Sequence, residues 1–355
     1  MTFSSIVEQQ DIRDHLQTAL RLGRLNHAYL ITGEAGMGRK LVARTFAQAA
    51  LCTDLQITET GAEPCGKCRS CIMMEAGTHS EYRELTHEKK AYGIDEIRTQ
   101  LVEDIALRPM VGERRVYFIA EGDLLSTACQ NAVLKTLEEP PEYVLILIAC
   151  ESPEALLETI RSRMVQLPLK PVSDAGVKQY LMRQERIPDY LAAECAAMAF
   201  GNIGKAVRYA ADDSFRNMVD RTTALLLDLK RLDTHAAMER VYGIFFPPEP
   251  GEEGAKKKKK QKKLKDVGAA ELMRFLDLLM LLNRDAMVCK ALGSPEKLVF
   301  AGQEAYDREA AGQEWSVLQG NLNRIGRARQ RLSASLSADL VLELLLLGMK
   351  HGEDL

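Results

Sequence analysis

The sequence feature that most restricts the fold of this chain is a glycine-rich turn between an apolar run and a helical pattern. The apolar run is Ala28–Ile31, and the turn reads Gly33-Glu34-Ala35-Gly36-Met37-Gly38-Arg39-Lys40. A strand, a glycine-rich loop and a helix in this order form a phosphate-binding loop, and Gly33 and Gly38 have the spacing of G-x-x-x-x-G-K-S/T. The backbone N–H groups of such a loop can surround an anion at the N-terminus of the following helix.

The turn lacks the side chains with which such a loop handles a nucleotide. Arg39 stands at the lysine position of the motif, and Lys40 stands where a serine or threonine would ligate Mg²⁺. The acidic strand end that holds Mg²⁺ in ATPases is also incomplete, because the run Val116–Ala120 ends in alanine and only Glu121 follows. We therefore expect no ATP hydrolysis by this chain, and binding of ATP by the loop stays open. The residues of this degenerate phosphate loop are Gly33, Gly36, Gly38, Arg39 and Lys40.

Four cysteines form a second motif, spaced as C-x12-C-x2-C-x2-C: Cys52, Cys65, Cys68 and Cys71. Four thiolates can close the tetrahedral shell of one Zn²⁺ and leave no open position for a substrate. The spacing predicts a structural zinc site, with unconnected free thiols as the alternative, and His79 is expected to be a structural histidine. The remaining cysteines stand singly in apolar patterns and are expected to be small core residues: Cys129, Cys150, Cys195 and Cys289.

Apolar runs alternate with helical patterns up to about Leu169, an order typical of an α/β fold with a parallel sheet. The expected buried strands are Ala28–Ile31, Val116–Ala120 and Tyr143–Ala149. After Pro171 only helical patterns follow: Ala175–Arg183, Tyr190–Ala199, Asn202–Ala211, Phe215–Tyr242, Ala269–Lys290 and Gly320–Lys350. We expect an α/β domain at residues 1–170 with a zinc module at 52–71, a helical lid at 171–212, and an all-α domain at 213–355.

A basic linker interrupts the all-α region at residues 247–265, where Lys256–Lys260 and Lys262-Lys263 follow a proline- and glycine-rich segment. Like charges repel and cannot form a core, which favours a solvated stretch over a dedicated contact with nucleic acid.

Length and charge limit the class of protein. A chain of 355 residues has room for two or three domains. The net charge of −3 gives no overall attraction to nucleic acid or membranes. Because no apolar run reaches the 18 or more residues of a membrane span and the N-terminus has no signal-peptide pattern, we expect a cytoplasmic protein without membrane contact. In a reducing compartment, a cluster of cysteines favours a metal site over a set of disulfide bonds.

Further motifs follow in the order of one known family: Asn26–Leu30, the cysteine cluster, Asn131–Pro141 and Ser162-Arg163. Together with the glycine-rich turn they resemble the AAA+ clamp-loader family of bacterial DNA polymerase III, through about residue 210. The resemblance is weaker in Asn321–Gly348, which looks like that family's collar domain. It implies an AAA+ P-loop NTPase-like domain with a zinc module, followed by a helical lid and an all-α collar.

Within this family, the degenerate loop and the missing acidic residue resemble the delta-prime subunit, since the gamma/tau motor subunits keep both. In clamp loaders a Ser-Arg-Cys motif supplies an arginine finger to ATP on the neighbouring subunit. Here Ser162 and Arg163 stand at that place, with Met164 instead of the cysteine. Arg161 is a competing arginine, and the structural alternative is that Arg163 caps a helix or pairs with a carboxylate.

Two departures from the motor subunits weaken nucleotide sensing: Cys150-Glu151 replaces threonines after a strand, and Gly204 replaces a sensing arginine. The resemblance implies a non-hydrolysing scaffold that assembles with gamma/tau and delta subunits into a hetero-oligomer. Such a scaffold is part of a DNA-directed DNA polymerase (nucleotidyltransferase) holoenzyme, and it meets the sliding clamp and primed DNA through that complex. An active gamma/tau-like ATPase motor and a zinc-bearing nucleic-acid adaptor are the alternatives.

Overall fold

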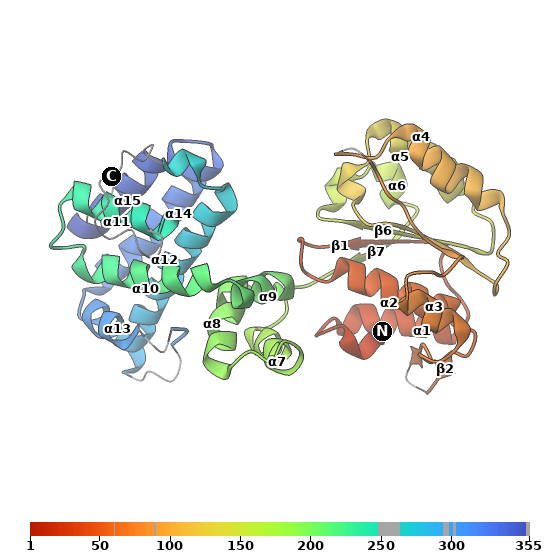
Figure 1. Cartoon of the computed structure of the whole chain (residues 1–355), viewed down its shortest axis with the longest axis horizontal. Helices are drawn as coiled ribbons and strands as arrows, with labels where there is room; N and C mark the ends of the chain where they lie inside the picture. Colours follow the sequence, from red (N-terminus) through yellow and green to blue (C-terminus); the bar gives the residue numbers. More distant parts are fainter. Residues whose placement is uncertain (60, 89, 248–262, 294–297, 301–302, 353–355) are drawn as a thin grey trace. The chain divides into compact units, whose positions relative to one another are not determined.

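The computed structural model describes residues 1–355 except 60, 89, 248–262, 294–297, 301–302 and 353–355 (Figure 1). Its contacts divide the chain into two units. The first is Met1–Tyr180 with Phe200–Lys205, and the second is Leu181–Ala199 with Ala206–Leu355. Residues 171–212, predicted as a separate lid, are therefore shared between the two units, and the predicted division into three domains stays a prediction.

The first unit is built on a parallel sheet with the strand order β4-β5-β6-β1-β7 (Figure 1). Its strands are β1 (Ala28–Thr32), β4 (Tyr82–Glu84), β5 (Arg115–Ile119), β6 (Val144–Cys150) and β7 (Val165–Pro168). In the centre of the sheet, Leu30 of β1 lies opposite Ile148 of β6. The three predicted strands are confirmed. The edge strands β4 and β7 escaped prediction because they are short and mostly exposed, so they lack a buried apolar run.

Helices cover both faces of this sheet. On one face are α1 (Gln10–Arg21) and α2 (Arg39–Leu51), and on the other are α5 (Thr127–Glu138) and α6 (Glu158–Arg161). Successive side chains of each strand point to opposite faces of the sheet. Phe118 of β5 packs in the core with α1 and α2, and its neighbour Tyr117 packs in the core with α5. Both faces are therefore buried, which explains the continuous apolar runs.

The cysteine motif lies in an insertion between α2 and β4. It contains an antiparallel pair, β2 (Gln56–Ile57) and β3 (Ala62–Glu63), and the helix α3 (Arg69–Glu75). A further helix, α4 (Ile94–Ile97), continues into a π-helical stretch, Arg98–Glu103, before β5.

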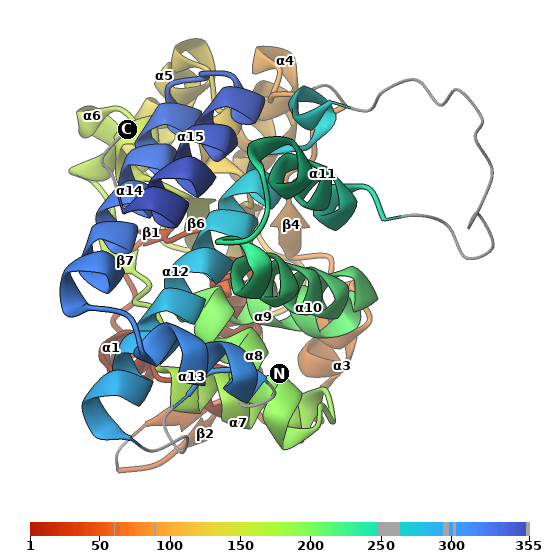
Figure 2. The same ribbon diagram turned by 90° about the vertical axis from the view of Figure 1, so that its left-hand side faces the viewer.

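The second unit is helical in its described residues. Its helices are α8 (Asp189–Ala199), α10 (Asp213–Asp228), α11 (Thr234–Phe245), α12 (Ala269–Leu292), α13 (Glu304–Ala311), α14 (Trp315–Ser333) and α15 (Ala338–His351). The long apolar helix α12 contacts α10, α13 and α14 (Figure 2). Two further helices, α7 (Asp174–Gln184) and α9 (Ile203–Ala211), begin in the first unit and end in the second.

Two predicted helical regions are each broken into two helices. Phe215–Tyr242 divides because Asp233 caps α11, with its carboxylate accepting the Ala236 N–H at 2.8 Å. Gly320–Lys350 divides at Ser335, whose φ of 61° lies in the left-handed region that ends helices.

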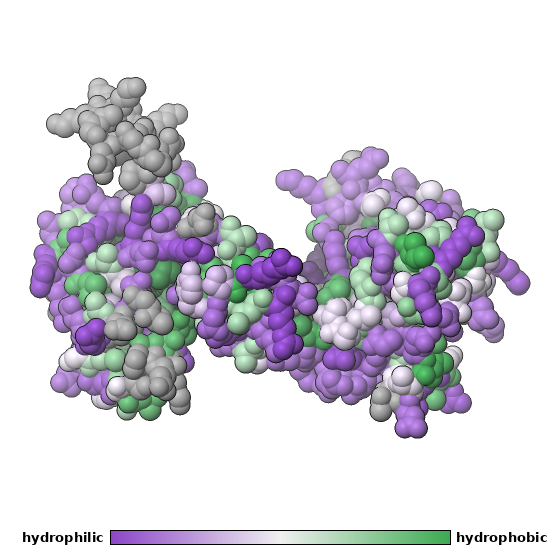
Figure 3. Space-filling model, turned by 60° about the horizontal axis from the view of Figure 1, so that its bottom comes forward, coloured by the Kyte–Doolittle hydropathy of each residue, from purple (hydrophilic) through white to green (hydrophobic). Residues whose placement is uncertain are grey.

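The basic run falls almost wholly outside the described residues, so its predicted solvated state stays a prediction. On the face shown in Figure 3, apolar side chains lie in small groups among polar ones. Over the part of the chain that the structure describes, no helix combines the length and apolarity needed to cross a membrane.

Candidate functional site

The glycine-rich turn has the backbone that its sequence predicts. It joins β1 to α2, and Gly33, Gly36 and Gly38 have φ angles of 151°, 95° and 98°. Residues with a side chain rarely adopt these angles, so each glycine is needed for the course of the loop. Gly38 is the N-cap of α2, whose first intrahelical bond runs from the Val42 N–H to the Gly38 carbonyl at 3.0 Å. The backbone of a phosphate-binding loop is therefore present.

Arg39, the first residue of α2, lies against two carboxylates that follow neighbouring strands. Its guanidinium is 3.7 Å from Asp123 Oδ2 and 3.6 Å from Glu151 Oε1, and its side chain is only 13% exposed. Asp123 follows β5 and Glu151 follows β6. The Asp123 carboxylate also accepts the Glu151 N–H at 2.8 Å, which fixes its position. An internal cation thus neutralises two acids beside the loop.

The magnesium positions of the motif are occupied by other contacts. Lys40 extends to Glu84 of β4, with 3.9 Å between Nζ and Oε1, and is mostly exposed. Ala120 is buried and offers no ligand, and Glu121 is 3.0 Å from His87 Nε2. The acid that survives at this strand end is therefore engaged with a histidine.

Residues from far along the chain also reach the loop. Asn202 Nδ2 donates to the Ala35 carbonyl at 2.9 Å, and the Gly204 N–H donates to the Gly36 carbonyl at 2.9 Å. Gly204 was singled out in the sequence only as a missing sensor, and the role of Asn202 was missed. No sequence signal marks these contacts beyond the Gly-Asn turn before α9.

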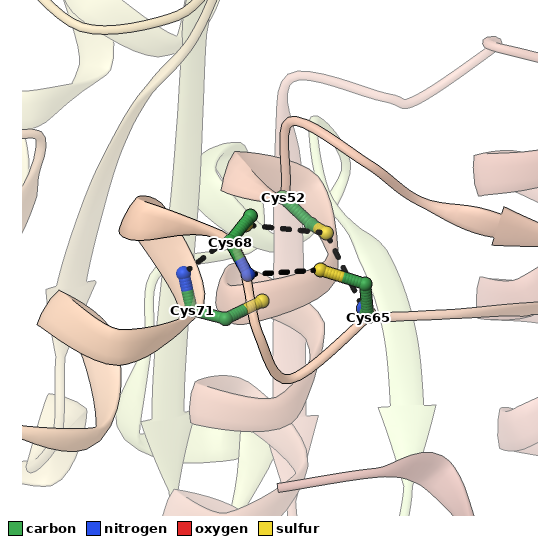
Figure 4. A group of neighbouring side chains, drawn as sticks. All are labelled: Cys52, Cys65, Cys68 and Cys71. Atoms are coloured by element: carbon green, nitrogen blue, oxygen red, sulfur yellow. Dashed lines mark hydrogen bonds between the residues drawn. The ribbon is translucent and has the colours of Figure 1, made fainter.

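The four predicted metal ligands converge on one point (Figure 4). Every pair of Sγ atoms lies within 4.8 Å, and Cys52 and Cys68 Sγ are 3.8 Å apart. Zn–S bonds of about 2.3 Å in a tetrahedron place sulfur atoms about 3.8 Å apart. Backbone N–H groups point at the sulfurs: those of Cys65, Cys68 and Cys71 donate to Cys52, Cys65 and Cys68 Sγ at 3.4, 3.2 and 3.4 Å. The four cysteines can therefore bind one metal ion.

The thiols of the cluster differ in acidity. Burial disfavours the thiolate of Cys68, but hydrogen bonds from Thr53 and from the Cys71 N–H favour it and lower the pKa to about 6. Burial raises the pKa of Cys71, which is fully buried. His79 is not a member of the cluster: its Nδ1 accepts the Glu81 N–H at 3.1 Å, so its Nε2 donates to Ser70 Oγ at 3.1 Å. This arrangement agrees with a structural histidine.

The single cysteines agree with the prediction at three positions. Cys129, Cys150 and Cys195 are fully buried, and burial raises the pKa of Cys150 to about 12. Cys289 is only partly buried, so its assignment to the core was wrong. Its place near the C-terminal end of α12 puts it at the margin of the helical packing.

Arg163 follows the short helix α6. Its guanidinium donates to the Thr159 carbonyl at 2.8 Å and lies 2.8 Å from Glu138 Oε1, and Ser162 Oγ also donates to the Thr159 carbonyl at 3.2 Å. Both contacts of the structural alternative, a helix cap and a carboxylate pair, are therefore present. The Arg163 and Glu138 side chains are 36% and 48% exposed, and exposed pairs contribute about 0–1 kcal/mol. The competitor, Arg161, has a buried Nε without a hydrogen-bond partner.

The fold and the loop define a P-loop NTPase-type protein of the AAA+ class with a cysteine-rich insertion. Residues 8–173 match the family model described as "DNA polymerase III, delta subunit". The DNA polymerase III subunit delta' of Bacillus subtilis is 26% identical over 340 residues, which cover 95% of this chain and 94% of that protein. The delta' subunit of Escherichia coli is 31% identical over 205 residues, covering 57% of this chain and 60% of that protein.

The tau/gamma subunit of Haemophilus influenzae is 37% identical over 207 residues, covering 57% of this chain. The chain spans under a third of the length of the tau and tau/gamma relatives that it matches first. These matches support a clamp-loader AAA+ family of DNA polymerase III for this chain, and the match over nearly its whole length is to a delta' subunit.

Proposed function

We propose that this chain is a delta-prime-like scaffold subunit of a DNA polymerase III clamp loader. It assembles with gamma/tau and delta subunits in the cytoplasm, hydrolyses no ATP itself, and supplies Arg163, with Ser162, to ATP on a neighbouring subunit. That site then drives loading of the sliding clamp on primed DNA. The chain is thereby a non-catalytic part of a polymerase holoenzyme.

The observation that carries this proposal is the contrast between two arginines. Arg39 is held inside the protein by Asp123 and Glu151, so it is not free to act on a phosphate. Arg163 follows the end of α6, and its partners among the described residues, the Thr159 carbonyl and the Glu138 carboxylate, belong to exposed residues. A guanidinium delivered to a neighbouring site can stabilise charge on a transferring phosphoryl group, an effect worth about 10³–10⁵ in rate.

The cysteine cluster supports a structural zinc ion in the same scaffold. Its four sulfurs all lie within 4.8 Å of one another, with Cys52 and Cys68 Sγ 3.8 Å apart, and four protein ligands leave no position for a substrate. Cys52 follows α2 directly, and Cys68 is the N-cap of α3. A metal ion held by Cys52, Cys65, Cys68 and Cys71 would therefore join the ends of two helices.

The test of the finger is the Arg163→Ala variant in a complex reconstituted with gamma/tau and delta subunits. We expect assembly, followed by size-exclusion chromatography, to be retained, and DNA-stimulated ATP hydrolysis to fall at least several-fold. Arg161→Ala is the control, because this neighbour carries the same charge and is expected to leave hydrolysis near its normal rate. Normal hydrolysis with Arg163→Ala would exclude the finger.

A gamma/tau-like motor is the second candidate, favoured by the 37% identity to a tau/gamma subunit. It predicts ATP turnover by the purified chain alone that survives Arg163→Ala. If the chain is instead a scaffold subunit, the purified chain should show no ATP turnover above background. A chain that fails to join the reconstituted complex would instead favour a zinc-bearing adaptor that binds nucleic acid.

A further inference from the structure

The start of helix α9 lies directly on the phosphate loop, within the first unit. Asn202 is 2% exposed, and its amide makes two hydrogen bonds. Its Nδ2 donates to the Ala35 carbonyl at 2.9 Å, and its Oδ1 accepts the Lys205 N–H at 3.0 Å. One buried side chain therefore caps α9 and binds the loop at the same time. An exposed ion pair adds to this contact, with Lys205 Nζ 2.6 Å from Glu34 Oε2.

Two glycines make the contact a backbone-to-backbone one. The Gly204 N–H donates to the Gly36 carbonyl at 2.9 Å. A Cβ atom at Gly204 would lie 2.7 Å from Gly36 Cα and 2.9 Å from its carbonyl oxygen. A Cβ atom at Gly36 would lie 2.5 Å from Asn202 Oδ1. No side chain fits at either position without moving the two segments apart, so the approach depends on both glycines.

A sharp turn at Phe200 and Gly201 also fixes the start of α9, from the N-terminal side of the segment. Phe200 and Gly201 have φ angles of 48° and 79°, and the Val172 N–H donates to the Gly201 carbonyl at 3.0 Å. A phenylalanine in the left-handed region is unfavourable by about 1–3 kcal/mol and persists only where surrounding contacts determine the conformation. The segment is therefore held between Val172 and the loop.

We propose that residues Asn202–Lys205 form a latch that holds the phosphate loop in one conformation without any nucleotide. The latch is made of the protein's own groups: a buried amide and a peptide N–H donate to two loop carbonyls, and a lysine pairs with Glu34. The loop and the start of α9 then form one rigid piece that does not respond to ATP. The latch rests on the proposed scaffold function, because it is what would keep the degenerate phosphate loop of such a subunit in one conformation.

Hydrogen–deuterium exchange of the purified full-length chain tests the latch, read on peptides covering residues 33–41 and 200–206. In the wild-type protein we expect the 200–206 peptide to be protected, because the Gly204 and Lys205 N–H groups donate to Gly36 and Asn202, and we expect exchange of both peptides to be unchanged by millimolar Mg·ATP. Gly204→Ala inserts a methyl group between the two backbones, and we expect exchange of the 200–206 peptide to rise at least tenfold. Gly326→Ala is the matched control, because this glycine is also helical and a Cβ atom there meets nothing within 4 Å.

Asn202→Ala keeps the backbones and removes only the buried amide. Loss of its two hydrogen bonds is expected to raise exchange of the 200–206 peptide by about tenfold. The control is Asn217→Ala, at an exposed position of α10, which should leave this exchange unchanged. Wild-type exchange in both Gly204→Ala and Asn202→Ala, or a clear change on adding Mg·ATP to the wild type, would overturn the latch. Neither result bears on Arg163, whose test is hydrolysis by the assembled complex, so the two proposals can fail separately.

Discussion

The phosphate loop and the cysteine cluster are both short turns that bring several polar groups to one point. Both rely on glycines with positive φ, at positions 33, 36 and 38 in the loop and at Gly66 in the cluster. The cluster still presents all four of its ligand atoms. The loop presents a backbone alone, because Arg39 is paired with Asp123 and Glu151 and Lys40 extends to Glu84. Backbone geometry and ligand chemistry are thus separable, and the first can persist without the second.

The largest expected effect is on the cluster. Cys71→Ser replaces a fully buried ligand by a weaker one, so zinc content should fall from one ion per chain to near zero, with a loss of several kcal/mol in the free energy of unfolding. Metal analysis and thermal unfolding of the purified protein measure both quantities. Cys289→Ser, at a partly buried cysteine far from the cluster in sequence, is expected to change neither. Unchanged metal content in Cys71→Ser would remove the contrast between the two turns.

A smaller effect is expected from Gly36→Ala in the loop. The substitution combines an unfavourable φ of 95° with a Cβ atom 2.5 Å from Asn202 Oδ1, and we expect a loss of about 2–3 kcal/mol in unfolding experiments. Gly23→Ala isolates the cost of the backbone angle, because Gly23 has a φ of 65° and open space around it. That control should lose only about 1 kcal/mol. Equal losses would show that the loop is not packed against Asn202.

The ion pair at the loop predicts a weak dependence of stability on pH. A hydrogen bond from Lys205, and its positive charge, lower the pKa of Glu34. A carboxylate whose pKa is lowered by folding stabilises the folded state above its unfolded pKa, and this contribution is lost as the pH falls through the lowered value. Glu34→Gln should therefore cost under about 1 kcal/mol at pH 7, since the pair is largely exposed, and nothing in strong acid. A difference that grew on acidification would contradict this assignment.

The smallest expected effect is from restoring the motif. In the double variant Arg39→Lys with Lys40→Thr, we expect ATP binding by isothermal calorimetry to remain undetectable. The reason is that Ala120 still offers no carboxylate and the latch still holds the loop. Measurable Mg·ATP binding would show that the loop lost only two side chains and is otherwise a working site.

Much of this molecule could be predicted from its sequence. The central strands were found because burial on both faces demands continuous apolar runs, and the cysteine cluster because its ligands lie close together in the chain. The edge strands β4 and β7 were not found, because exposed short strands leave no pattern. The break at Asp233 was also missed, since a capping aspartate interrupts a helix without changing its apolar spacing.

The sequence by itself determined which groups are present: three glycines that set the course of the loop, four thiols within twenty residues, and an arginine at position 39 instead of lysine. Only the tertiary structure decided what those groups meet. Arg39 pairs with Asp123 and Glu151, which follow two different strands. Asn202 donates a hydrogen bond to Ala35, which is 167 residues away in the sequence. The physical reason is that backbone angles and side-chain chemistry are local properties of the sequence. Contacts between distant segments depend on how the sheet and its helices pack.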